Sequence, residues 1–389
     1  MKTINGLIVA LVVASTFFMS SCDRSESVSE MNSQEEKAFV NASNQLDLDL
    51  IALSVIDVMA DPVAKNEILQ ELQSNKNGIE VQDFLSSLKT IQSESGLADI
   101  EQIVEQSKAA NSTVEEHGVV EVPELWLYEP SVPADMQDCL YAYAPQGEEE
   151  NWEYIRAYNS KKEVVYLDPY ELPKVPVIVI ESKGHKALEL QVSLMNKQLA
   201  QMGARVEMKS QLKASSDLET TMLKKIRMND DKEPWIKGKA EIYAVTSGIR
   251  MNNGKGEPQI NIIALPYLDE EDKDYYPNQI LLFWDDYAYQ AANIQFFEQD
   301  SNYNYKELVS ILVEGVFDIA AIASEQAWLP IVGKMASKII EVIPDNWWTD
   351  GDDYADSFYT LMKDRIYSDQ YGAAGNVKVT LEPFTVPAN

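Results

Sequence analysis

Carboxylate side chains are concentrated in the last third of this sequence, at positions where β-strands are expected to end. Five acids lie within 269–274, and four lie within 350–356. Two further pairs each follow an apolar run, and these are Asp285-Asp286 and Glu298 with Asp300. Loops at one end of a β-sandwich can supply the about six to eight oxygen atoms that bind calcium. The pattern therefore predicts a calcium site at that end. The alternative is an acidic rim that contacts only solvent.

The last acidic group does not have the spacing of an EF-hand loop. Its acids miss the alternating ligand positions, and Leu361 occupies the place of the final Glu. Two segments, NIQFFEQDSNYNY (293–305) and DGDDYADSF (350–358), instead resemble the calcium-binding loops of C2 domains. That resemblance implies five calcium ligands, which are Glu298, Asp300, Asp352, Asp353 and Asp356.

Two adjacent tryptophans, Trp347 and Trp348, lie next to the last acidic group. Aromatic rings pack on the apolar faces of other molecules, so this pair could form a surface for a sugar or a lipid. We take it as a candidate ligand surface beside the predicted calcium site.

Catalytic motifs are absent from the sequence. It contains no HExxH, no G-x-S-x-G, no P-loop and no dinucleotide-binding glycine pattern. The two histidines, His117 and His185, each lie beside a glycine and are expected in solvated loops. Cys139 lies in an apolar run and is expected to be a buried small side chain. No catalytic residue is predicted. A hydrolase that uses paired carboxylates stays as the alternative, because such a pair can act as acid and base.

The N-terminus carries a targeting signal. Lys2 precedes the apolar stretch Gly6–Phe18, which is too short to cross a membrane comfortably and is typical of a signal peptide. The following Met19-Ser20-Ser21-Cys22 resembles a bacterial lipobox, which implies that Cys22 is acylated and becomes the first mature residue. An ordinary secretory signal is the alternative. We expect a signal peptide over 1–21 and a flexible tether over 22–34.

The net charge of the chain is −31, from 32 basic and 63 acidic residues among 389. Such a protein repels polyanions, which excludes nucleic acid and anionic lipid headgroups as partners held by charge. Attachment to the membrane must therefore come from the lipid on Cys22. We expect a cell-envelope protein, at the outer membrane on either its periplasmic or its surface side.

Apolar periodicity predicts an α+β protein in three parts. A helical region is expected over 35–116, a β-rich module over 117–233, and a β-sandwich over 234–389 with a helical hairpin inserted at about 306–343. The hairpin carries acids at four places in its first helix, so a packed hairpin is favoured over membrane insertion. Those acids are Glu307, Glu314, Asp318 and Glu325.

A wider resemblance covers most of the mature chain, in segments that include YAPQGEEENWEYIRAY, KGKAEIYAVTSGI and the ending GNVKVTLEPF. It is to uncharacterised bacterial lipoproteins with a domain of unknown function, and it implies an architecture and a location but no activity. The leading hypothesis is an envelope lipoprotein that binds a protein or glycan partner through calcium. Pore formation by the hairpin is a third possibility after the carboxylate hydrolase.

Overall fold

The computed structural model describes most of the chain from Leu46 onwards. The described residues are 46–75, 78–90, 96–131, 139–147, 151–182, 184–205, 217–230, 234–238, 240–268, 270–299, 305–322, 328–342 and 354–388. Within them the protein is α+β, as the sequence predicts: helices come first, followed by one mixed sheet and two antiparallel sheets with further helices.

The first helices form one layer of the N-terminal half. They are α2 (Leu48–Met59), α3 (Pro62–Ser74), α4 (Val81–Thr90), α5 (Leu97–Ser112) and the short α6 (Val114–His117). Asp61 caps α3 by accepting a hydrogen bond from the amide of Val63, with Pro62 at the first helical position, which confirms the start that the Asp-Pro pair predicts. The apolar sides of α2–α5 pack against a sheet and build the first core.

That sheet has six strands in the order β1-β2-β6-β3-β4-β5. Among the strands that the structure describes in this sheet, β3 and β6 run parallel to each other and the other neighbouring pairs are antiparallel. Leu125 and Ile180 point toward the helices, while Val177 and Val179 point to the other face, where Ile236 of η4 (Trp235–Lys237) packs on them. The strands are β1 (Ile79–Glu80), β2 (Glu124–Tyr128), β3 (Leu140–Ala142), β4 (Ile155–Tyr158), β5 (Val164–Leu167) and β6 (Val177–Glu181).

The C-terminal half is a β-sandwich of two four-stranded antiparallel sheets, ordered β10-β7-β14-β13 and β12-β11-β8-β9. Apolar residues of both sheets meet between them in one core. Asn253 and Gly254, both at positive φ, make the tight turn between β8 and β9. The strands are β7 (Leu218–Met228), β8 (Ile242–Asn252), β9 (Lys255–Ala264), β10 (Gln279–Phe283), β11 (Ala291–Glu298), β12 (Tyr354–Met362), β13 (Tyr367–Tyr371) and β14 (Val377–Val386).

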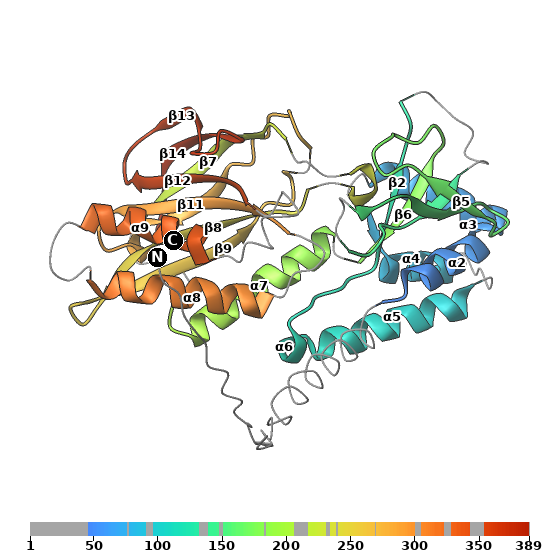
Figure 1. The fold of residues 1–389 in the computed structure, drawn as a ribbon, viewed down its shortest axis with the longest axis horizontal. Helices are drawn as coiled ribbons and strands as arrows, with labels where there is room; N and C mark the ends of the chain where they lie inside the picture. The colour runs from blue at the N-terminus through green and yellow to red at the C-terminus, as the bar shows by residue number, and fades with distance from the viewer. Residues whose placement is uncertain are drawn as a thin grey trace, which may run out of the picture. The chain divides into compact units, whose positions relative to one another are not determined.

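Three helices cover the outer face of the sheet that contains β8, β9 and β11, as Figure 1 shows for α8 and α9. They are α7 (His185–Gln201), α8 (Tyr305–Ile322) and α9 (Trp328–Val342). Asn293 and Gln295 of β11 donate hydrogen bonds to the α9 carbonyls of Val332 and Ala336. The hairpin of α8 and α9 is therefore packed on the sheet, as expected. None of the helices in the described ranges is long and apolar enough to cross a membrane.

Two features differ from the sequence expectations. The sandwich was expected to begin at residue 234. Strand β7 lies before that residue and nevertheless pairs with β10 and β14 inside the sandwich. Its outward-facing basic residues interrupt the apolar alternation by which a strand is recognised in a sequence. The expectation for His185 was wrong, because it is the first residue of α7 and is buried.

Candidate functional site

Only two of the five predicted calcium ligands, Glu298 and Asp356, lie within the described residues. They belong to the neighbouring strands β11 and β12, and both are buried. Asp300, Asp352, Asp353, the pair Trp347 and Trp348, and Cys22 lie outside the described residues.

The carboxylate of Asp356 accepts hydrogen bonds from four backbone amides. Oδ1 accepts from Ser357 at 2.8 Å and Ala374 at 2.7 Å, and Oδ2 accepts from Asn376 at 2.9 Å and Val377 at 2.8 Å. Gly372 gives the carboxylate its room, because a Cβ there would lie 2.3 Å from Oδ1. These bonds fix the loop between β13 and β14, so Asp356 has a structural role in this arrangement.

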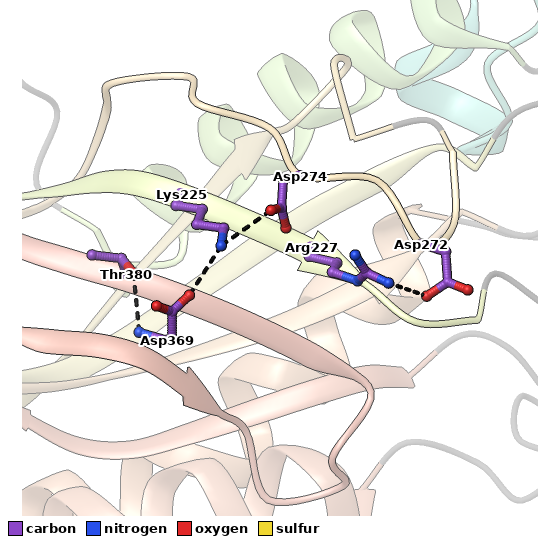
Figure 2. A network of polar contacts seen from close by, with 6 residues as sticks. All are labelled: Lys225, Arg227, Asp272, Asp274, Asp369 and Thr380. Atoms are coloured by element: carbon purple, nitrogen blue, oxygen red, sulfur yellow. Dashed lines mark hydrogen bonds and ion pairs between the residues drawn. The ribbon is translucent and has the colours of Figure 1, made fainter.

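The acidic loop before β10 is partly neutralised by basic residues of β7 (Figure 2). Lys225 lies between Asp274 and Asp369, with its Nζ 3.1 Å from each carboxylate. Arg227 pairs with Asp272 at 2.6 Å. The outer face of the sandwich thus carries a network of alternating charges at a place where the sequence shows mainly acids.

No group of three or more His, Cys, Asp or Glu side chains suited to a metal occurs among the residues that the structure places. Calcium binding therefore stays a prediction. Cys139 is buried, and burial raises the pKa of its thiol to about 12, so at neutral pH it stays a protonated thiol.

A different candidate surface lies on β4 and β5. Arg156 is opposite Tyr166, and Tyr158 is opposite Val164, so these four side chains share one face of the sheet. The alternate residues Ile155 and Ala157 pack on the other face. Tyr158 is buried under the helices, and we call the exposed set Tyr154, Arg156, Val164 and Tyr166 the Tyr154–Tyr166 surface.

Two tyrosine rings of this surface face solvent. Tyr154 is 51% exposed and Tyr166 is 64% exposed. Their rings meet edge to face with centroids 4.6 Å apart, so each ring limits the movement of the other. Exposed aromatic side chains held in this way offer an apolar surface that loses little side-chain entropy when a ligand binds.

Polar groups border the rings on one side. Asp49 of α2 accepts hydrogen bonds from the hydroxyls of Tyr143 and Tyr158, and Arg156 lies 3.7 Å from the same carboxylate and over the Tyr158 ring. Burial raises the pKa of Asp49, but the bonds from Tyr158 and Tyr143 and the charge of Arg156 outweigh it and lower the pKa overall. The carboxylate is therefore ionised at neutral pH.

The sequence predicts these residues only as part of the β-rich module over 117–233. The signal was present in the run Tyr154–Tyr158, where a tyrosine, an arginine and a tyrosine alternate with apolar residues. Such alternation predicts that one face carries the polar and aromatic side chains. What it could not show is that the helices leave part of that face open.

Comparison with known proteins gives a family but no activity. No curated protein and no solved structure matches the chain. The family described as "Protein of unknown function (DUF3103)" matches residues 53–389, which takes in both sheet regions. This confirms the part of the expected resemblance that concerned a domain of unknown function. With most of its length matched, the chain belongs to the DUF3103 family.

Proposed function

We propose that this protein is a lipid-anchored cell-envelope protein that binds a glycan through the Tyr154–Tyr166 surface. The observation that carries the binding role is the pair of exposed, mutually packed rings of Tyr154 and Tyr166 beside Arg156. The lipobox-like Met19–Cys22 carries the anchoring role.

The chemistry of the surface supports a sugar ligand. The C–H faces of a pyranose ring pack well on tyrosine rings, and hydroxyl groups need nearby hydrogen-bond donors and acceptors. Arg156 and Asp49 supply a donor and an acceptor, with side chains 47% and 35% exposed. Because the whole chain carries a net charge of −31, a neutral or basic glycan fits better than an acidic one.

A protein partner is the second candidate, and strand β5 favours it. β5 is the last strand in the order of the six-stranded sheet, and in the described part of the chain it pairs with β4 alone. An edge strand can accept an extended peptide through backbone hydrogen bonds. Such a partner would bury Val164 and Tyr166 without requiring Arg156 or Asp49.

Binding is tested on the full-length protein in detergent, with immobilised envelope polysaccharides and with the remaining envelope proteins. We expect retention on polysaccharide and at least a tenfold loss of affinity in Tyr154→Ala and Tyr166→Ala. Tyr276→Ala is the matched control, because Tyr276 is also 65% exposed but lies outside this surface. Retention only of proteins would favour the β5 edge, and no retention of either would refute the binding role.

Anchoring is tested by incorporation of labelled palmitate in cells. We expect label on the wild type and on Cys139→Ser, and none on Cys22→Ser. Cys139 is the right control because the chain has only these two cysteines. Equal labelling of Cys22→Ser would rule out the anchor without affecting the binding proposal.

A further inference from the structure

Strand β5 forms a regular, apolar edge of the six-stranded sheet. It is the last strand in the sheet order, and β4 is its only neighbour among the strands that the structure describes. Its pairing with β4 runs from Ile155 opposite Leu167 to Tyr158 opposite Val164 without a shift of register. Val164 is 42% exposed and Tyr166 is 64% exposed. Another strand can add to an edge of this kind.

The backbone amides and carbonyls of Val164 and Tyr166 point away from β4. In an antiparallel pair, opposite residues alternate between those that exchange hydrogen bonds and those that do not. The Asn159 amide donates to the carbonyl of Glu163, its opposite residue, at 3.1 Å, so this is a hydrogen-bonded pair. Counting in steps of two, Val165 also bonds to β4. Val164 and Tyr166 therefore direct their backbone groups to the outer side of the edge.

Each of the other edge strands in the described ranges has a feature that hinders the addition of a strand. β1 has only two residues, and β10, β12 and β13 each pair with their neighbour through a shifted register. Strand β9 contains Pro258, which has no amide hydrogen, and its Ile260 amide already donates to the Ala204 carbonyl at 2.9 Å. β5 has no proline, no register shift and no residue at positive φ. Its edge is thus left suitable for pairing.

The charges at the two ends of β5 are opposite. Lys162 precedes the strand and Asp168 follows it. Oδ1 of Asp168 accepts from the amides of Tyr170 and Glu171 at 2.8 and 3.0 Å, which holds the carboxylate at the strand end. Lys162 pairs with Asp57 at 2.7 Å, and its ammonium has further N–H groups for a second carboxylate. In an antiparallel pair of identical strands, the start of one lies beside the end of the other, so this edge is complementary to itself.

We propose that the protein forms a two-fold dimer in which the β5 strands of two copies pair antiparallel about Val165 and join the two six-stranded sheets. In this register Val164 of one copy lies opposite Tyr166 of the other, and their outward backbone groups exchange hydrogen bonds. A β-branched residue opposite an aromatic one is a favourable cross-strand pair. Lys162 of each copy lies opposite Asp168 of the other. The contact uses the same patch on both copies, as a two-fold dimer requires.

A second copy fits this edge because the order of its charges matches only in the antiparallel, self-paired arrangement. The pairing uses the backbone of β5 and leaves the rings of Tyr154 and Tyr166 on an open face. It therefore goes beyond the glycan proposal and holds whether or not the rings bind a sugar. If they do, the two Tyr154–Tyr166 surfaces lie side by side on one face of the joined sheet, and a polysaccharide that contacts both is bound more tightly.

The first test is the mass of the full-length protein in detergent, measured by light scattering without glycan. The salt concentration is about 0.15 M, because the net charge of −31 makes copies repel each other at low salt. We expect a dimer at micromolar concentration and a dissociation constant at least tenfold higher in Val164→Pro. Proline removes the outward amide and leaves the bonds of β5 to β4 in place. Val164→Thr keeps the amide and the branched shape, so it is the control and should dimerise.

The second test is disulfide cross-linking of Val165→Cys in the Cys139→Ser background. In the proposed register the two Val165 Cα atoms lie about 4.5 Å apart, which a disulfide can bridge. Leu167→Cys is the matched control, because Leu167 is on the same strand and the same face but lies opposite Glu163 of the second copy. We expect a cross-linked dimer in Val165→Cys alone, above the level of the background protein, which keeps Cys22.

Four results would overturn the proposal. These are a monomeric wild type, dimerisation that Val164→Pro does not weaken, equal cross-linking at residues 165 and 167, and cross-linking of Val165→Cys in cell envelopes to a different protein. If Val164→Pro does not fold, as judged by circular dichroism, Val164→Lys takes its place, because a charge on the edge also disfavours pairing. Loss of polysaccharide retention without loss of the dimer would refute only the glycan proposal.

Discussion

Oδ2 of Asp356 lies 2.8 Å from the backbone nitrogen of Val377, and this hydrogen bond joins the two sheets of the sandwich. Asp356 belongs to β12 of one sheet, and Val377 is the first residue of β14 in the other. The Ala373 amide adds a second connection by donating to the Ser357 carbonyl at 2.8 Å. Asp356, which the resemblance to C2 domains implies to be a calcium ligand, thus links the two sheets of the sandwich.

Replacing Asp356 by Asn should destabilise the protein strongly. Asn presents one acceptor oxygen where four amides now bind, and it places an NH₂ group against buried donors. We expect a loss of about 2–4 kcal/mol in the free energy of unfolding, measured by urea denaturation. Asp364→Asn is the control, because Asp364 is exposed and already has positive φ, which Asn tolerates.

The same variant examines the calcium prediction. If backbone amides are the partners of Asp356, its substitution should cost the same stability with and without millimolar calcium. A loss that appears only in the presence of calcium would instead identify Asp356 as a ligand.

Removing the rings of the Tyr154–Tyr166 surface should affect binding and not folding. Both side chains are largely exposed, so Tyr154→Ala and Tyr166→Ala should each change the free energy of unfolding by less than about 0.5–1 kcal/mol. Asp49→Asn should cost about 1–2 kcal/mol, because it weakens the bonds from Tyr143 and Tyr158. A ring variant that unfolds would show that these tyrosines are part of the core.

Stability should fall as the pH rises through the acidic range. Folding raises the pKa of Glu124 from 4.5 to about 7, so between these values the folded state holds a proton that the unfolded state has lost. Glu124→Gln should remove this part of the decline, at most about 3 kcal/mol. Urea titrations at pH 4.5 and 7.5 measure it, and an equal slope in the variant would contradict the raised pKa.

Asp286 should contribute a second, separable change of stability with pH. Burial raises its pKa from 3.8 to about 6, with a contribution from Asp285 and against the opposing charges of Arg205 and Arg250. Asp286→Asn should therefore reduce the loss of stability between about pH 4 and 6. The loss between about pH 6 and 7, which comes from Glu124, should remain. If Asp286→Asn altered only the upper part, this assignment would be wrong.

The network of Figure 2 should be sensitive to salt. Replacing Lys225 by Gln leaves Asp274 and Asp369 without the cation between them, so the melting temperature should fall slightly at low salt. Added salt screens exposed charges and should bring wild type and variant together. A difference that persists at 1 M salt would point to packing by the lysine stem and not to charge.

Apolar patterns predicted most elements of the fold because burial imposes a period on the sequence. The β-sandwich and the hairpin at about 306–343 were both expected, and acids such as Glu314 correctly indicated a hairpin packed on the sheet. The sequence did not predict β7, because Lys225 and Arg227 point outward and interrupt its apolar pattern. Their acidic partners, Asp274 and Asp272, lie far from them in the sequence. The sequence could not show that Glu124 lies opposite Glu181, because that depends on the register of β2 against β6.

Strand β14 has a consequence for how the protein matures. It lies between β7 and β13 and pairs with β7 over ten residues, from Val377 opposite Met228 to Val386 opposite Leu218. Contacts between segments this far apart in sequence form slowly, because a long loop must close first. The sandwich cannot close until residues 377–386 have emerged from the ribosome or from an export channel. Shortened chains that end before Val377 should therefore be degraded, whatever their N-terminal half has formed.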